Sequence, residues 1–248
     1  MRRLLLAVAM CAMAATAAYP QSSDRSTQLS DNVGREKPAV NVQGNPDAPL
    51  GITVEMKWAT PDQQMLEVYF TVKNIGRKPI RAYTVRVSHG TETQEDAGCF
   101  LNNTEKLGKI LQPNQSIGRS TWRPISLSDP QSAIGLILDF VEFTDGSVWG
   151  VDGCQSAERL SGLRAGARVA KLRFKRKLDE RGIDALLKQL YTDDPDLAVP
   201  EGHSDAWKAG FRGAISSFRE RIRRANEEGG LPEVNDALQR PFDASENQ

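Results

Sequence analysis

Residues 66–87 read LEVYFTVKNIGRKPIRAYTVRV, and this stretch decides the fold class of the chain. Apolar and polar residues alternate over residues 66–73, and alternation with a period of two predicts a half-buried β-strand. Asn74, Gly76 and Pro79 follow, and they favour a turn because Asn and Gly tolerate positive φ while Pro fixes φ. A second alternating segment completes the stretch. We therefore predict a β–β unit of an antiparallel sandwich.

Further short strand-like segments flank this unit and are separated by turn residues. The most hydrophobic one, residues 134–143, loses its strict alternation at Phe140 and Val141, which indicates a β-bulge. About seven short strands over about 100 residues are typical of an immunoglobulin-like sandwich. After Cys154 the apolar period changes to three and four residues, which predicts helices. The predicted fold class is a β-sandwich (immunoglobulin-like, antiparallel) followed by an α-helical C-terminal region.

The N-terminus has the features of a secretory signal peptide. Residues 1–3 carry two arginines, residues 4–15 are apolar, and residues 15–17 (ATA) form a small-x-small cleavage site. The apolar run is shorter than the roughly 20 residues that a membrane-spanning helix needs, although an uncleaved short anchor is the alternative. We expect an exported protein, periplasmic or extracellular.

Two cysteines, Cys99 and Cys154, remain after removal of the signal peptide. Two lone cysteines in a small exported domain usually pair, and we predict that these form a disulfide bond. Such a bridge closes a loop of about 55 residues and stabilises the fold by about 4 kcal/mol in the chain-entropy model. Two buried free thiols are the alternative.

Composition and turn residues divide the chain into five segments. Residues 19–49 contain few apolar side chains and cannot offset the entropy cost of ordering, which is typical of a disordered linker. The predicted organisation is a signal peptide (1–18), a disordered linker (19–49), an immunoglobulin-like β-sandwich (50–153), an α-helical region (154–230) and a flexible tail (231–248).

The α-helical region has recognisable caps and one strong apolar stripe. Ser156 is predicted to cap the first helix of this region. Ser204 or Asp205 is predicted to cap the last helix, and Pro232 is predicted to end it. The stripe of the last helix consists of Trp207, Phe211, Ile215, Phe218 and Ile222. We expect the stripe to pack in a core; if the helices extend away from the sandwich, it becomes a partner-binding surface instead.

Four residues of the opening stretch, Val72, Asn74, Gly76 and Pro79, carry a family resemblance. Together with DFVEFTDGSVWGVD near the end of the predicted sandwich, the stretch resembles immunoglobulin-like accessory domains of bacterial envelope and secreted proteins. In these, a strand ending in Val-x-Asn-x-Gly is followed by Pro and a second strand. The resemblance covers roughly residues 50–153. It implies a sandwich and carries over no functional residue.

The sequence lacks the usual signatures of catalysis and of cofactor binding. Lys plus Arg and Asp plus Glu both number 32, so no global charge indicates a nucleic-acid partner, and an export signal disfavours one. The two histidines, His89 and His203, lack metal-ligand spacing, and there is no nucleophile elbow, phosphate loop or dinucleotide fingerprint. We predict no enzyme activity and no cofactor.

One acidic cluster, Asp139, Glu142 and Asp145, offers hard oxygen ligands of the kind that bind calcium. Strand alternation, however, directs Asp139 and Glu142 to different faces. Asp145 with Gly146 is explained by turn formation. We therefore predict no metal site.

A basic segment after Cys154 is the strongest candidate for binding. Seven Lys and Arg residues fall between Leu163 and Leu178 with no acidic residue among them. The spacing of four, three and four places four of them on one helical face: Arg164, Arg168, Lys171 and Lys175. Such a face attracts an anionic membrane, an envelope polymer or an acidic protein surface. The alternative is a solvated face whose charges are paired by nearby carboxylates.

We therefore expect an exported non-catalytic binding or interaction module whose partner is an unknown protein or envelope component. The alternative is an envelope-associated structural protein that docks on an anionic membrane or cell-wall surface through the basic helix.

Overall fold

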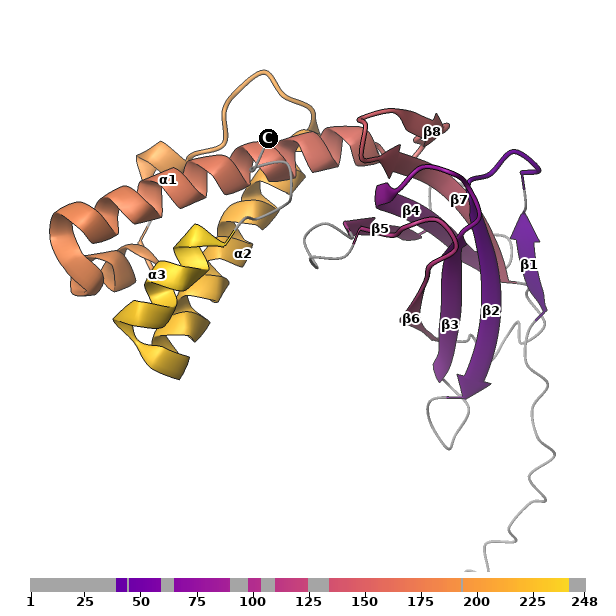
Figure 1. Cartoon of the computed structure of the whole chain (residues 1–248), viewed down its shortest axis with the longest axis horizontal. Coiled ribbons are helices and arrows are strands. Elements are labelled where there is room, and N and C mark those ends of the chain that lie inside the picture. Colours follow the sequence, from indigo (N-terminus) through magenta and orange to yellow (C-terminus); the bar gives the residue numbers. More distant parts are fainter. Residues whose placement is uncertain are drawn as a thin grey trace, which may run out of the picture. The chain divides into compact units, whose positions relative to one another are not determined.

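The computed structural model describes residues 39–43, 45–58, 65–89, 98–103, 110–124, 134–192 and 194–240. All of them belong to one compact unit, Glu36–Gln248. Within this described part, strands β1 to β8 precede the helices, and α1, η2, α2 and α3 follow (Figure 1). The predicted signal peptide, residues 1–18, lies outside the described residues.

Two sheets build the strand-rich part of the unit. Sheet A has the order β1-β7-β4-β5, with β8 also paired to β7, and sheet B has the order β2-β3-β6. The strands are β1 (Val40–Gln43), β2 (Leu50–Trp58), β3 (Met65–Asn74), β4 (Ile80–His89), β5 (Gly98–Asn103), β6 (Ser116–Pro124), β7 (Ile134–Phe143) and β8 (Val148–Gly150).

Both sheets contribute side chains to a single hydrophobic core. Alternate residues of each strand face inward, as the period of two predicts. Strand β3 contributes Val68, Phe70 and Val72 to this core, and β4 contributes Tyr83, Val85 and Val87. Strand β7 contributes Leu136, Leu138 and Val141. The strand-rich character and the following helices agree with the prediction from sequence.

The turn within the opening stretch connects the two sheets. β3 lies in sheet B and β4 in sheet A, so the two strands are not paired with each other. Asn74 is fully buried between them, and its side-chain amide donates to the carbonyl oxygens of Lys78 (3.0 Å) and Leu111 (2.9 Å). Its side-chain oxygen accepts from the Gly76 amide at 3.0 Å. Asn74 therefore holds the crossover in shape by satisfying backbone groups that the turn leaves unpaired.

Sheet A is mixed, so the prediction of an antiparallel arrangement is wrong at its edge. β1 pairs with β7 in parallel, with Val40 opposite Ile134. β1 also lies inside the segment 19–49 that composition assigned to a disordered linker. Four residues give too little alternation to identify a strand, and this strand is ordered by pairing with β7 rather than by its own apolar content.

Helices occupy the rest of the described chain. α1 (Ser156–Gln189) is interrupted at Gly182, whose φ of 75° and ψ of −179° are not helical. The short 3₁₀ helix η2 (Pro195–Leu197) follows, and then α2 (Asp205–Gly229) and α3 (Leu231–Gln239). α3 contradicts the flexible tail predicted for residues 231–248. Pro232 lies in the first turn of α3. Backbone N–H groups in a first turn have no acceptor within the helix, so a proline is tolerated there and Pro232 can start α3.

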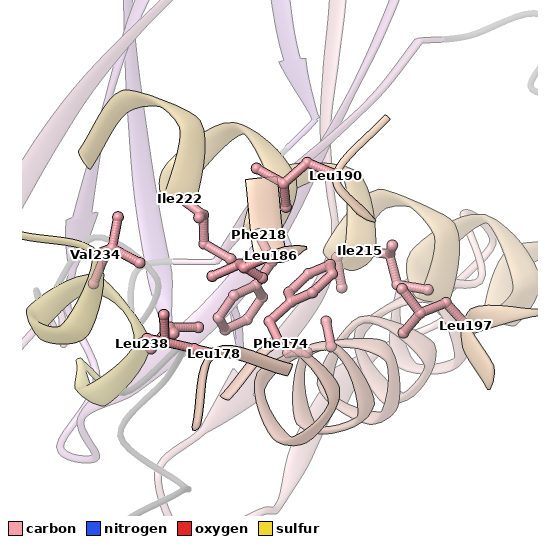
Figure 2. Close-up of a cluster of buried hydrophobic side chains, with 14 of the residues drawn as sticks. Phe174, Leu178, Leu186, Leu190, Leu197, Ile215, Phe218, Ile222, Val234 and Leu238 are labelled. Carbon is pink, nitrogen blue, oxygen red and sulfur yellow. The ribbon is translucent and has the colours of Figure 1, made fainter. Parts of the chain in front are cut away.

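The helices share a core of their own (Figure 2). Its members all lie between residues 163 and 238, and they include Phe174 and Leu178 of α1, and Val234 of α3. The apolar stripe predicted for the last helix is buried there, which confirms core packing: Trp207, Phe211, Ile215, Phe218 and Ile222. Ser204 caps α2 as predicted, since its hydroxyl accepts from the Trp207 amide at 3.2 Å.

Glycines allow α1 and α2 to approach very closely. A Cβ atom on Gly162 would lie 2.0 Å from the Trp207 carbonyl oxygen, and one on Gly210 would lie 2.0 Å from the Arg159 carbonyl oxygen. Both obstacles are backbone atoms, which cannot rotate away as a side chain can. These glycines cost intrinsic helix stability, and what they permit in return is backbone contact between the helices.

We expect Gly210→Ala to destabilise the protein and Gly213→Ala to stabilise it. Gly210→Ala forces α1 and α2 apart, and overpacking of this kind costs about 1–3 kcal/mol. Gly213 lies in the same helix, and a Cβ atom there would meet no described residue within 4 Å, so alanine gains about 1 kcal/mol of helix propensity. Urea unfolding followed by circular dichroism measures both. Equal shifts of the two midpoints would contradict the close approach.

Candidate functional site

The outer face of sheet A, opposite the hydrophobic core, carries polar and charged residues that are buried. On β4 these are Thr84 and Arg86, and on β7 they are Asp139 and Glu142. A face of this composition is expected to meet solvent in an isolated sandwich. Here the start of α1 and the loop that precedes it cover this face, because both make the contacts described below.

A β-bulge places Asp139 on this outer face. Thr84 pairs with Phe140 while Val85 pairs with Leu138, which leaves Asp139 as the extra residue of β7. The bulge that the broken alternation predicted is therefore confirmed. The sequence argument that directed Asp139 and Glu142 to different faces is wrong, because the bulge shifts the phase between them.

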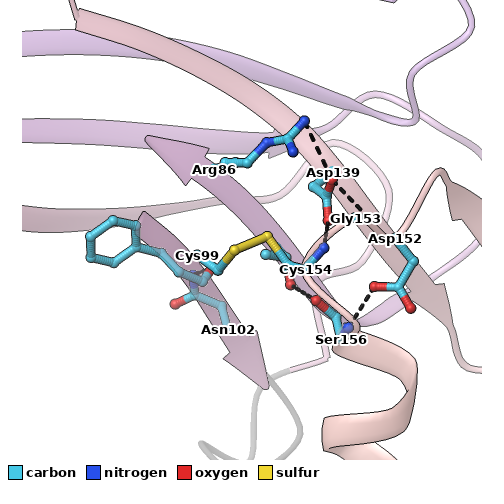
Figure 3. The surroundings of a disulfide bond; sticks show 10 residues. Arg86, Cys99, Asn102, Asp139, Asp152, Gly153, Cys154 and Ser156 are labelled. Atoms are coloured by element: carbon cyan, nitrogen blue, oxygen red, sulfur yellow. Dashed lines mark hydrogen bonds and ion pairs between the residues drawn. A yellow bond between two sulfur atoms is a disulfide. The ribbon is translucent and has the colours of Figure 1, made fainter. Parts of the chain in front are cut away.

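Asp139 is completely buried and is held by two hydrogen bonds and one ion pair. Its carboxylate accepts from the backbone amides of Gly153 (3.2 Å) and Cys154 (2.9 Å). The guanidinium of Arg86, itself buried, lies 3.8 Å from the same carboxylate (Figure 3). One buried carboxylate thus fixes the loop that leads into α1 and neutralises the charge of Arg86.

The disulfide bond joins the same loop to the neighbouring strand. Cys99 in β5 is bonded to Cys154, with an S–S distance of 2.01 Å and a Cα–Cα distance of 6.0 Å (Figure 3). Cys99 lies opposite Arg86 in the sheet register, so the bridge and the Asp139–Arg86 pair lie side by side. This bond fits the pairing predicted from the sequence.

The first turn of α1 is capped by Asp152 rather than by Ser156. The Asp152 carboxylate accepts from the amides of Ser156 (2.5 Å) and Ala157 (3.0 Å). The Ser156 hydroxyl, predicted to be the cap, is instead buried and hydrogen-bonded to the Thr84 hydroxyl at 2.7 Å. Sequence reasoning missed Asp152, although a carboxylate just before a helix is a recognised signal for its start.

Two further contacts attach α1 to sheet A beyond this turn. Leu160 packs in a small buried cluster with Ala82 and Phe140 of the outer face. One turn later, Arg164 makes a bidentate ion pair with Glu142, with nitrogen–oxygen distances of 2.9 and 2.8 Å. The side chain of Arg164 is only 21% exposed. Arg164, predicted to bind an anionic surface, is thus used inside the protein.

The other predicted binding residues differ in their environment. Arg168 is exposed and has no ion-pair partner among the described residues. Lys171 is half-buried, and Lys175 pairs with Asp179 one turn further along α1 at 2.9 Å. Four, three and four spacing does place these side chains along one side of α1. The spacing alone could not show which of these cations form ion pairs within the protein.

A smaller exposed surface remains on α1, which we call the basic face: Arg168, Leu172, Lys175 and Arg176. Leu172 is 64% exposed, and the three cations lie four residues before it and three and four residues after it. Positions three and four apart are neighbours on a helix, so the cations surround an exposed apolar side chain. Sequence reasoning identified the charge of this face but not its apolar centre.

Another cation of the basic segment, Arg173, lies outside the basic face and holds the segment around the start of η2. It pairs with Asp194 at 2.8 Å and with Asp196 at 2.7 Å. Burial alone would raise the pKa of Asp194, but the hydrogen bonds from Arg173 and from the Asp196 amide outweigh it and hold the pKa below its ordinary value of 3.8. Asp194 therefore carries a charge that Arg173 compensates.

The described residues contain no group of three or more His, Cys, Asp or Glu side chains placed to hold a metal ion. His203 stacks on Trp207, with ring centroids 3.7 Å apart. Among the described helices none is both long and apolar enough to span a membrane.

No protein-family model matches this chain, and no curated protein matches it either.

Proposed function

We propose that this chain is an exported, non-catalytic binding module in which a β-sandwich of immunoglobulin-like type presents a helical unit to a partner. The observation that carries the proposal is the basic face: a largely exposed Leu172 surrounded by Arg168, Lys175 and Arg176 on a helix that is anchored to sheet A. Export to the periplasm or beyond rests on the predicted signal peptide.

The immunoglobulin-like part of this proposal is supported by the strand-rich unit. Its two sheets share one core, and its Asn74 crossover occupies the place of the Val-x-Asn-x-Gly motif. The parallel pairing of β1 adds a strand that the antiparallel sandwich does not require. In such folds the rigid sheets position the parts that make contacts.

Rigid attachment of α1 supports a role in presentation. The disulfide, the Asp139 contacts, the Asp152 cap and the Arg164–Glu142 pair all act within the first nine residues of α1 or in the loop before it. A surface on a helix fixed in this way loses little conformational entropy on binding, which increases affinity.

The chemistry of the basic face favours an acidic protein surface with an apolar contact at its centre. Complete burial of a leucine contributes about 1.5–3 kcal/mol, whereas each exposed ion pair contributes about 0.2–1 kcal/mol. Leu172 is therefore expected to contribute more to the affinity than any single cation, and the cations are expected to supply most of the specificity. An apolar centre with a charged rim is the usual anatomy of a protein interface.

Docking on an anionic membrane or cell-wall surface is the second candidate, favoured by the charge of the same face. A cation near an anionic membrane contributes about 1 kcal/mol. Arg164 is engaged by Glu142 and Lys175 by Asp179, so fewer cations are available than the sequence suggested. This makes the protein partner the stronger candidate.

Site-specific photocrosslinking tests the proposal in the native cell envelope. A photoreactive phenylalanine replaces Leu172 in one variant and Thr53 in a control, since Thr53 is exposed on β2 in sheet B. We expect a discrete protein adduct at position 172 alone. Its yield should fall with Arg168→Gln plus Arg176→Gln but not with Arg223→Gln plus Arg224→Gln, a matched pair of exposed cations on α2.

Flotation with phosphatidylglycerol vesicles separates the two candidates. One outcome is salt-sensitive flotation that depends on Arg168 and Arg176, without an adduct at position 172. It would contradict the protein partner and support docking on an anionic surface. If the protein gives no adduct at position 172 and does not float with the vesicles, a binding role for the basic face is contradicted.

A further inference from the structure

A second feature of the helical unit is a cavity of about 550 Å³ between the segment 194–199 and the side of α2 that carries residues 212–219. Cavities of about 300–1,000 Å³ are the size range in which proteins bind small molecules. None of the residues of the basic face lines it.

One wall of the cavity carries cations and a hydroxyl. Arg212, Ser216 and Arg219 are spaced four and three residues apart, so they lie along one side of α2. Arg212 is exposed and has no ion-pair partner among the described residues. The Arg219 guanidinium donates to the Thr192 carbonyl oxygen at 3.2 Å, while its Nε–H is buried and meets no acceptor in the described part of the chain. Guanidinium groups donate charge-assisted hydrogen bonds to oxyanions, so Arg212 and the outer N–H groups of Arg219 give this wall the chemistry to bind an anion.

The facing wall is mostly apolar and is held in shape. It includes Pro195, Leu197 and Val199, and Ile215 adds an apolar side chain from the α2 wall. Asp194 begins the 3₁₀ helix by accepting from the Asp196 amide at 3.0 Å. Asp194 also lines the cavity, and its negative charge is offset in part by Arg173, which it shares with Asp196.

We propose that this cavity binds a small organic anion, with an oxyanion head on Arg212 and Arg219 and a short apolar body against Pro195, Leu197 and Val199. The head is a carboxylate or a phosphate monoester, since guanidinium groups bind both. Ser216, between the two arginines, offers a further hydrogen bond. This site goes beyond the proposed partner surface, because other residues build it.

Titration of ¹⁵N-labelled protein, followed by the backbone amide signals, tests this inference. The probes are hexanoate and hexyl phosphate, which distinguish the two kinds of head. Acetate and inorganic phosphate lack the apolar body, and hexanol lacks the charge. We expect saturable shifts confined to residues 194–199 and 212–219. Hexanoate, hexyl phosphate or both should bind tenfold more tightly than any of the three control compounds.

Arg212→Gln is the decisive variant, because Arg212 is exposed and its loss leaves the fold intact. It should weaken binding about tenfold, and Arg219→Gln should weaken it further. Arg224→Gln, on the same helix but outside the cavity, should leave the affinity unchanged. The inference is overturned if hexanol binds as well as hexanoate, if the shifts lie elsewhere or fail to saturate, or if Arg212→Gln binds like the original protein.

Discussion

Replacing Asp139 by alanine is expected to lower the free energy of unfolding by about 3–5 kcal/mol, because it leaves a buried charge without its counter-ion and two backbone amides without their acceptor. The buried charge is that of Arg86, and the amides are those of Gly153 and Cys154. Two hydrogen bonds and one buried ion pair meet at this carboxylate, which is why we expect the substitution to have a larger effect than the loss of a surface ion pair.

A double-mutant cycle separates the buried charge from the lost hydrogen bonds. Arg86→Leu removes the guanidinium, so Asp139→Ala plus Arg86→Leu should recover part of the stability that Asp139→Ala loses. Asp145→Ala, in the exposed turn after β7, is the control and should have a much smaller effect. Chemical unfolding gives the free energies of the four proteins of the cycle and of the control. An effect of Asp139→Ala as small as that of Asp145→Ala would mean that the three contacts do not hold α1 to the sheet.

The sequence predicted the features of this fold that depend on local pattern. Alternation identified β3 and β4, and broken alternation identified the bulge in β7. The apolar stripe of α2 predicted its buried face, because a helix repeats every three to four residues. Each of these signals lies within one element, so a single sequence contains all the information that it requires.

Contacts between elements were not predictable in the same way. Arg164 looked like one of four equivalent cations, and its partner Glu142 lies 22 residues earlier on a strand. The predicted direction of Glu142 relative to Asp139 was wrong because the bulge shifts the phase of the strand by one residue. From sequence alone a glycine such as Gly162 or Gly210 only weakens a helix, because the close approach that it permits exists only where two helices meet.

The candidate site was predicted in part for the same reason. Charge density along α1 follows from sequence alone, and the predicted face shares Arg168 and Lys175 with the basic face. The exposed state of Leu172 depends on which side of α1 packs against α2, so it required the structure. The cavity beside α2 joins a 3₁₀ segment to a helix and has no signature in either segment.

Removal of the disulfide bond is the second change with a large expected effect. Cys99 and Cys154 are 55 residues apart, and in the chain-entropy model a bridge of this span stabilises the native state by about 4 kcal/mol. We expect Cys99→Ser plus Cys154→Ser to lower the free energy of unfolding by about this amount. For a protein of this size the melting temperature should then fall by roughly 8–16 °C.

The serine variant has a natural control in the reduced form of the unmodified protein, which lacks the same bond but keeps both sulfur atoms. If the bond acts by restricting the unfolded chain, the two forms should have similar stability, and both should still fold. Hydrogen exchange adds a local test. Without the bond, amides of β5 and of the first turn of α1 should exchange faster, whereas those of Phe218 and Ile222 in the helical core should change only with global stability. Unchanged exchange in the first turn of α1 would mean that the contacts of Asp139, Asp152 and Arg164 hold the helix to sheet A without the bridge, and that the disulfide acts on the unfolded chain alone.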